Sequence, residues 1–140
     1  MSMIFYGECD QDSPLPIYGQ IISQITKVLV TQSTVSSLLV RVYEYASKAD
    51  AESNTNGTQI GSDITLTKTS VIFDALQTTD PGDKMITTKG TGYNFATILP
   101  AASFPEGDKW YRADLRITPS SGDEYTGGKW VLECQARAGG

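Results

Sequence analysis

The chain has 140 residues, of which 39% are hydrophobic and 19% charged, which predicts one compact domain spanning residues 1–140. Its formal net charge is −5 and its Lys and Arg residues form no run, which argues against a nucleic-acid partner because phosphate binding requires clustered cations. No stretch approaches the roughly 18 consecutive apolar residues of a membrane helix, and the first residues lack a basic region followed by an apolar one. We therefore expect synthesis in the cytoplasm and no membrane partner.

The N-terminal segment, residues 1–18, is expected to form an extended arm. Ile4 to Glu8 concentrates β-branched and aromatic residues and is predicted to be a short strand. Met1, Met3 and Phe5 are candidate interface residues, because an arm can add a strand to the exposed sheet edge of a neighbour.

Two cysteines, Cys9 and Cys134, lie near opposite ends of the chain. This number is far below the cysteine density of a secreted disulfide scaffold. We predict two small buried thiols on a first and a last strand. If those two strands pair, the thiols lie close enough to oxidise.

Residues 20–32 carry two competing patterns. A helical period relates four of them: Ile21, Ile25, Val28 and Gln32. However, Ile, Thr and Val lose side-chain freedom in a helix and fit a pleated surface better. The residue types favour a strand, with an amphipathic helix as the alternative.

The central and C-terminal parts of the chain alternate in polarity with a period of two. Three predicted strands have an apolar face, which consists of Leu38, Val40 and Val42 in the first, Tyr111, Ala113, Leu115 and Ile117 in the second, and Trp130, Leu132, Cys134 and Ala136 in the third. Further strands are predicted at Ile60 to Leu66, Val71 to Phe73 and Tyr93 to Ile98. Turn residues separate these runs. Short strands at this spacing indicate an antiparallel sandwich or barrel, since parallel strands need long crossover connections.

Residues 46–57 form a polar insertion that we expect to be a mobile, contact-making loop. Within it, Ser47 could cap a helical turn built on Ala49 and Ala51.

Most catalytic arrangements are excluded by the residues present. The chain has no histidine, which removes Ser-His-acid and Cys-His nucleophiles and the commonest transition-metal ligand. Cys9 and Cys134 have no zinc spacing, and Gly90-Thr91-Gly92 lacks the Lys-Ser/Thr of a phosphate-binding loop. We expect no enzymatic activity and no cofactor.

Carboxylates leave two weaker hypotheses. Glycoside hydrolysis needs two carboxylates across a cleft, and the candidates are Asp74, Asp114, Glu124 and Glu133. Asp114 and Glu133 lie on polar strand faces, where a solvated charge is the simpler interpretation. Calcium could bind at Asp10/Asp12 or Asp80/Asp83, although Asp in turns needs no metal to explain it.

Candidate interface residues lie on the polar faces of the predicted strands. Trp110, Arg112 and Arg116 share one such face, and Arg41 and Tyr43 share another. An exposed Trp110 with nearby Tyr side chains could also serve as a stacking platform for sugars. The alternative function is therefore a carbohydrate-binding or adhesion module. Trp130 lies on an apolar face and is predicted to be in the core.

Four segments in chain order carry a resemblance to a known group: "VSSLLVRVY" from Val35, "VIFDALQ" from Val71, "GYNF" from Gly92 and "FPEGDKWYRADLRITPSSGDEY" from Phe104. The chain resembles, over roughly two-thirds of its length, small Ig-like proteins encoded among the structural genes of tailed bacteriophages and prophages. The resemblance implies an all-β, antiparallel Ig-like or fibronectin-type sandwich of about 7–9 strands with one long polar loop.

The resemblance also implies a function. It indicates a non-enzymatic virion structural protein, either a capsid decoration protein or a neck or tail subunit, made in the host bacterium. The implied partners are other virion proteins and further copies of the chain. Tyr111 is expected to pack beneath the preceding turn and to bond to the backbone there. No catalytic residue is implied.

Overall fold

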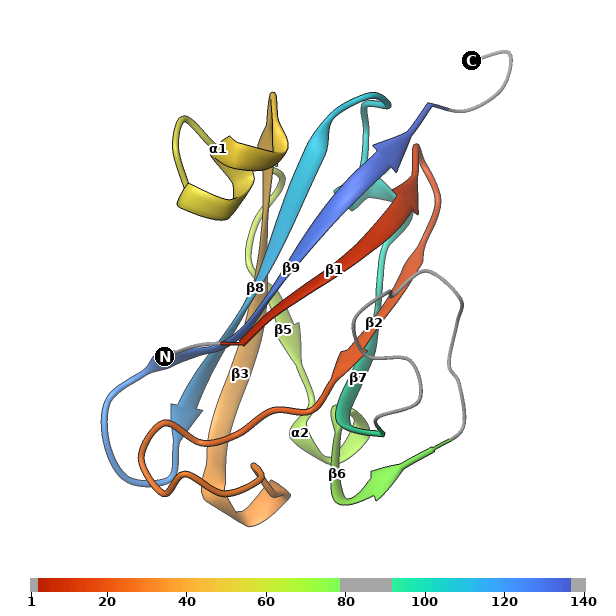
Figure 1. The fold of residues 1–140 in the computed structure, drawn as a ribbon. Coiled ribbons are helices and arrows are strands. Elements are labelled where there is room, and N and C mark those ends of the chain that lie inside the picture. Colours follow the sequence, from red (N-terminus) through yellow and green to blue (C-terminus); the bar gives the residue numbers. More distant parts are fainter. Residues whose placement is uncertain (1–2, 79–91, 137–140) are drawn as a thin grey trace.

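The computed structural model describes residues 3–78 and 92–136, in which nine strands form two facing sheets (Figure 1). The larger sheet has the order β1-β9-β8-β3-β4, with β5 also paired to β3, and the smaller has the order β2-β7-β6. The larger sheet contains β1 (Met3–Asp10), β9 (Tyr125–Gln135), β8 (Trp110–Pro119), β3 (Val35–Tyr45), β4 (Thr58–Gln59) and β5 (Ile64–Leu66). The smaller contains β2 (Leu15–Gly19), β7 (Tyr93–Leu99) and β6 (Ile72–Gln77).

The predicted all-β sandwich is confirmed. The β2-β7-β6 sheet and the β9-β8-β3 set have the strand order of the two sheets of an immunoglobulin-type sandwich. One pairing corrects the fully antiparallel expectation, because β1 runs parallel to β9. A parallel pair needs a long connection, and here the rest of the domain supplies it.

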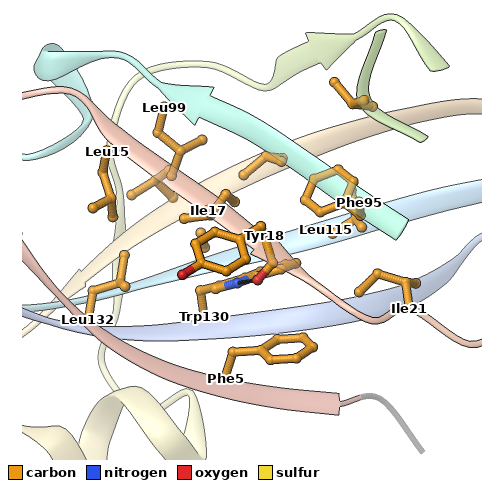
Figure 2. Packing of buried hydrophobic residues seen from close by; sticks show 14 of the residues in the cluster. Phe5, Leu15, Ile17, Tyr18, Ile21, Phe95, Leu99, Leu115, Trp130 and Leu132 are labelled. Atoms are coloured by element: carbon orange, nitrogen blue, oxygen red, sulfur yellow. Dashed lines mark hydrogen bonds between the residues drawn. The ribbon is translucent and has the colours of Figure 1, made fainter. Parts of the chain in front are cut away.

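The three alternating strands point their apolar faces into the space between the sheets, and Trp130 lies near the centre of the core they form (Figure 2). Its indole N–H donates to the Tyr18 carbonyl (3.1 Å), and the Phe5 ring stacks on it with centroids 4.9 Å apart. Trp130 is fully buried, as predicted. Ala136 is exposed, in contrast to the other residues predicted for these faces.

The predicted N-terminal arm is wrong for the part of it that the structure describes, because residues 3–18 belong to the chain's own sheets as β1 and β2. Phe5 is only 4% exposed and is a core residue rather than an interface residue. The strand period places Phe5 inward, and a Cβ on Gly19 would lie only 2.6 Å from its ring. Met1 lies outside the described residues.

The two cysteines are directly opposite each other in the β1–β9 pair. Both are buried, which confirms their predicted placement as thiols on a first and a last strand. Burial raises the pKa of the Cys134 thiol.

Residues 20–32 are neither the predicted strand nor the alternative helix. They form a loop with one isolated bridge between Ile22 and Leu29, and a short 3-10 turn (Gln32–Thr34) leads into β3. The buried Asn94 side chain holds the base of this loop. Its Oδ1 accepts from the Ile21 N–H (2.6 Å), and its amide donates to the carbonyls of Ile21 (3.0 Å) and Val30 (2.8 Å). These side-chain bonds replace the ladder that a strand would require.

Other predicted boundaries also shift. Only Ile64–Leu66 of the predicted strand at 60–66 is a strand, preceded by the short β4. A helical turn, α2 (Lys68–Val71), occupies the start of the strand predicted at 71–73. A second 3-10 turn (Ala101–Ser103) follows β7.

The polar insertion at 46–57 contains the predicted helical turn, α1 (Lys48–Ser53). Ser47 caps it by accepting a hydrogen bond from the Asp50 N–H (3.2 Å). Ala51 is fully buried against the larger sheet, so this part of the insertion is a packed helix rather than the expected loop. Tyr45 anchors the end of α1 through a 2.6 Å bond from its hydroxyl to Asn54.

Tyr111, at the start of β8, makes the backbone bond expected of it. Its hydroxyl accepts from the Glu106 N–H (3.0 Å) and lies within donating distance of the Glu106 carbonyl (3.0 Å) and the Glu44 carboxylate (2.9 Å). Burial raises the pKa of Tyr111. The 104–109 turn is therefore tied to β8 and β3 by one hydroxyl.

Replacing Tyr111 with Phe should lower the free energy of unfolding by about 1–2 kcal/mol, because it removes the partly buried hydrogen bonds to the Glu106 backbone and to the Glu44 carboxylate. Urea denaturation followed by tryptophan fluorescence measures this loss. The matched control is Tyr43→Phe, since the Tyr43 hydroxyl has no hydrogen-bond partner among residues 3–78 and 92–136. An equal loss in both variants would contradict the role given to the Tyr111 hydroxyl.

Candidate binding surfaces

The outer face of the larger sheet, which points away from the smaller sheet, brings together five of the predicted interface residues. Arg41 lies opposite Asp114 and Tyr43 opposite Arg112 in the β3–β8 register. Trp110 and Arg116 occupy the two ends of the same row on β8. The two faces predicted from the sequence, one on β8 and one on β3, are therefore parts of a single surface.

Arg112 is not exposed as predicted, because α1 packs over it. Arg112 is 3% exposed, and Asp114, predicted to be solvated, is 8% exposed. The Nη2 of Arg112 donates to Asp114 Oδ2, and the Nε of Arg112 lies near Asp114 Oδ1, both at 2.8 Å. Its Nη1 donates to the Ala51 carbonyl (3.2 Å), and the guanidinium lies 5.9 Å from the Tyr45 ring centroid. This pair attaches α1 to the sheet and is not available to a partner.

The other two arginines predicted to be interface residues bind carboxylates of their own chain at the surface. Arg41 pairs with Asp63 at 2.9 Å and holds the pKa of that carboxyl below its ordinary value. Arg116 pairs with Glu124 at 2.9 Å and also bonds Thr126. Exposed pairs of this kind contribute little to stability, so these side chains can exchange partners at low cost.

Trp110 lines a pocket of about 200 Å³ between α1 and strands β1, β9 and β8, which we name the outer-face pocket. Its lining includes Tyr6, Glu8, Lys48, Trp110, Val131 and Glu133. The Lys48 ammonium lies 5.2 Å from the Tyr6 ring centroid, and the Tyr6 hydroxyl donates to Glu52 (2.6 Å). That bond to Glu52 raises the pKa of Tyr6. Trp110 is half-buried, with its apolar body against Val131 and its neighbours.

The loop between β2 and β3 lies at the end of the sandwich opposite to α1 (Figure 1). It carries exposed apolar side chains. Ile22, Ile25 and Val28 are 38%, 53% and 60% exposed, and we name these three the loop-end cluster. The loop lies against the start of β9, where Gln24 donates to the Thr126 carbonyl (2.8 Å). Sequence reasoning missed this cluster because residues 20–32 were predicted to form a strand, or alternatively an amphipathic helix, and not an exposed loop.

Met3 and Ile4 open β1 at the same end of the molecule, beside Gly128 and Lys129 of β9. They are 36% and 42% exposed. Met3 therefore stays a candidate contact residue at an apolar end, as part of a strand rather than of an arm.

A wider, mainly apolar hollow of about 540 Å³ lies on the smaller sheet. Pro16, Phe73, Ala96 and Ile98 contribute to its lining, and Ile98 is 67% exposed. No candidate from the sequence falls here.

The candidate hydrolase carboxylates are not brought to one cleft. Asp74 accepts from the Gln32 N–H (2.8 Å), Asp114 is buried with Arg112, Glu124 pairs with Arg116, and Glu133 lines the outer-face pocket. Across the described residues, no group of three or more His, Cys, Asp and Glu side chains could hold a metal ion. Asp80 and Asp83 lie outside the described residues.

Comparison with known proteins finds no relative. No protein-family model matches the chain, and it has no match among the curated proteins or the solved structures. Within the described ranges, no helix is both long and apolar enough to span a membrane.

Proposed function

We propose that this chain is a non-enzymatic virion structural protein of a tailed phage, a capsid decoration protein or a neck or tail subunit, which acts through protein-protein contacts in the assembled particle. The segments that carry the resemblance to phage-encoded Ig-like proteins supply β3, β6 and β8, which are framework strands of both sheets. The Tyr111 bond to the turn before β8 agrees with that resemblance.

The loop-end cluster is the observation that carries the proposal. Three large β-branched side chains stand on a loop whose base is fixed by Asn94, so they are presented to solvent on a rigid support. Exposed apolar side chains concentrated on one short loop are typical of contact surfaces with other proteins. In a virion, symmetry multiplies even a modest contact into a stable assembly.

The double variant Ile25→Asp/Val28→Asp should lose assembly while keeping its fold. Both side chains are exposed, so the substitutions should change the free energy of unfolding by less than about 1 kcal/mol. We expect the wild-type chain to form an oligomer of fixed size or to bind companion virion proteins. The variant should bind at least about tenfold more weakly. Light scattering coupled to gel filtration and co-sedimentation with phage particles measure these two outcomes.

The matched control is Leu76→Asp/Ile98→Asp, which adds the same two negative charges at exposed apolar positions on the smaller sheet. Assembly lost only in the control would move the contact surface to that sheet and contradict the proposal. A wild-type monomer that joins neither particles nor companion proteins would also contradict it.

Carbohydrate binding is the second candidate, favoured by one observation: Trp110 and Tyr6 line the same pocket. Titration with oligosaccharides tests it directly through the NMR signal of the Trp110 indole N–H. The carboxylates that line that pocket favour a cationic occupant over a neutral sugar.

A further inference from the structure

The outer-face pocket has an aromatic wall and two carboxylates at neighbouring positions. Glu8 is in register with Glu133 on the next strand, and Glu133 is in register with Trp110 on the strand after it. Neighbouring strands lie about 4.8 Å apart. The two carboxylates and the indole therefore stand side by side across β1, β9 and β8, and all three residues line the outer-face pocket.

These three groups have no polar partner among the described residues. Glu8 and Glu133 are exposed and make no hydrogen bond or ion pair within residues 3–78 and 92–136, and the Trp110 indole N–H has no acceptor there. Lys48 also lines the pocket, and its ammonium lies over the Tyr6 ring.

Two neighbouring sites on the same face show how this surface holds a cation. Arg112 lies over the Tyr45 ring and pairs with a carboxylate, Asp114. Lys48 lies over the Tyr6 ring, whose hydroxyl binds Glu52. Each site combines a cation, an aromatic ring and a carboxylate. The row of Trp110, Glu133 and Glu8 supplies two of these three components, the aromatic ring and the carboxylates.

The charge of this end of the sandwich also favours a cation. The strand ends, the turns between them and α1 gather nine carboxylates and two lysines among the described residues: Glu8, Asp10, Asp12, Glu44, Asp50, Glu52, Glu106, Asp108 and Glu133, with Lys48 and Lys109. Such a field attracts basic groups and repels acidic ones before contact is made.

We propose that the outer-face pocket receives an arginine side chain of a partner protein in the virion. The planar guanidinium can stack on the indole of Trp110 and donate in a fork to Glu8 and Glu133, which a lysine ammonium cannot reproduce. This inference rests on the proposed function, since it names the chemistry of one contact between the chain and its partner. It uses the end of the sandwich opposite to the loop-end cluster.

The test follows the two indole N–H signals of the full-length, ¹⁵N-labelled protein by NMR during titration with blocked peptides. The probes are acetyl-Gly-Arg-Gly-amide, its Lys and Glu counterparts, and a neutral oligosaccharide panel. The Arg peptide should shift the Trp110 signal at millimolar concentration, with the Lys peptide weaker and the Glu peptide inactive. The Trp130 signal is the internal control, because its N–H is buried and bonded to Tyr18.

Two double variants each remove two negative charges from the end of the sandwich that carries α1. Glu8→Gln/Glu133→Gln changes the pocket, and Glu106→Gln/Asp108→Asn changes the 104–109 turn outside it. The first should weaken binding of the Arg peptide by about tenfold and the second by less than about twofold.

Equal weakening in the two variants would show general attraction to an acidic end and overturn the proposal. An unmoved Trp110 signal would overturn it too, as would an oligosaccharide that shifts Trp110 and binds the pocket variant undiminished, since that result assigns the pocket to sugar. These results are independent of the loop-end variants. Failure of the pocket therefore leaves assembly through the loop-end cluster standing, and loss of that assembly does not alter the NMR titration.

Discussion

Replacing Arg112 with Met, or Asp114 with Leu, should lower the free energy of unfolding by about 3–5 kcal/mol, because each change leaves the other charge buried without its partner. Both residues are nearly inaccessible beneath α1, and Arg112 also donates to the Ala51 carbonyl. The loss should therefore include loosening of α1 from the sheet. Urea denaturation at neutral pH measures the total loss in the free energy of unfolding.

The double variant Arg112→Met/Asp114→Leu separates the pair from its parts. It removes both charges and fills the space with apolar atoms, so it should recover most of the stability lost in either single variant. Arg116→Met is the control, because its partner Glu124 is exposed and the loss should stay below about 1 kcal/mol. Single variants at Arg112 and Asp114 no worse than this control would show that the pair is hydrated rather than buried.

Replacing Asn94 with Ala should lower the free energy of unfolding by about 3–5 kcal/mol and also abolish assembly. The side chain bonds three buried backbone groups, the N–H and carbonyl of Ile21 and the carbonyl of Val30. The Ile21 carbonyl also accepts from the Val30 N–H (3.0 Å), so the groups that lose their partner are the Ile21 N–H and the Val30 carbonyl. Each group left unpaired in the interior costs about 1–3 kcal/mol. The base of the loop that carries the loop-end cluster would then no longer be fixed.

Urea denaturation measures the loss of stability, and light scattering coupled to gel filtration measures the loss of assembly. Hydrogen exchange at the Ile21 amide shows whether the base of the loop has opened. Exchange at Ile21 should accelerate more than exchange in β8, because the opening is local. Gln24→Ala is the control, since it removes one partly buried bond from the same loop. A stable Asn94→Ala variant that still assembles would show that the loop is held by its own packing.

Much of the sandwich could be predicted from the sequence. The apolar faces of β3, β8 and β9, the core position of Trp130 and the capped turn at Ser47 all appear where the pattern placed them. Sequence reasoning also selected Trp110, which lines the outer-face pocket. It did not identify Glu8, Tyr6 or Lys48 as its neighbours, because the pairing of the first and last strands was considered only as a condition and residues 46–57 were expected to be a mobile loop.

The errors share one cause. Phe5 and Arg112 were both expected at the surface, yet each is covered by a segment distant in the chain: the smaller sheet covers Phe5, and α1 covers Arg112. The apolar residues at 21–28 were expected to be regular structure. Asn94, more than 60 residues away, instead holds the loop in a form that leaves Ile25 and Val28 exposed.

Side-chain alternation, turn chemistry and helix capping depend on residues within a few positions of each other, so the sequence alone specifies the strands of the core and the start of α1. Which face of the larger sheet is covered, where β1 pairs and which apolar residues reach solvent depend on contacts between segments far apart in the chain. Those contacts form only when the two sheets and α1 pack together. For this reason the loop-end cluster and the outer-face pocket became visible only in the folded molecule.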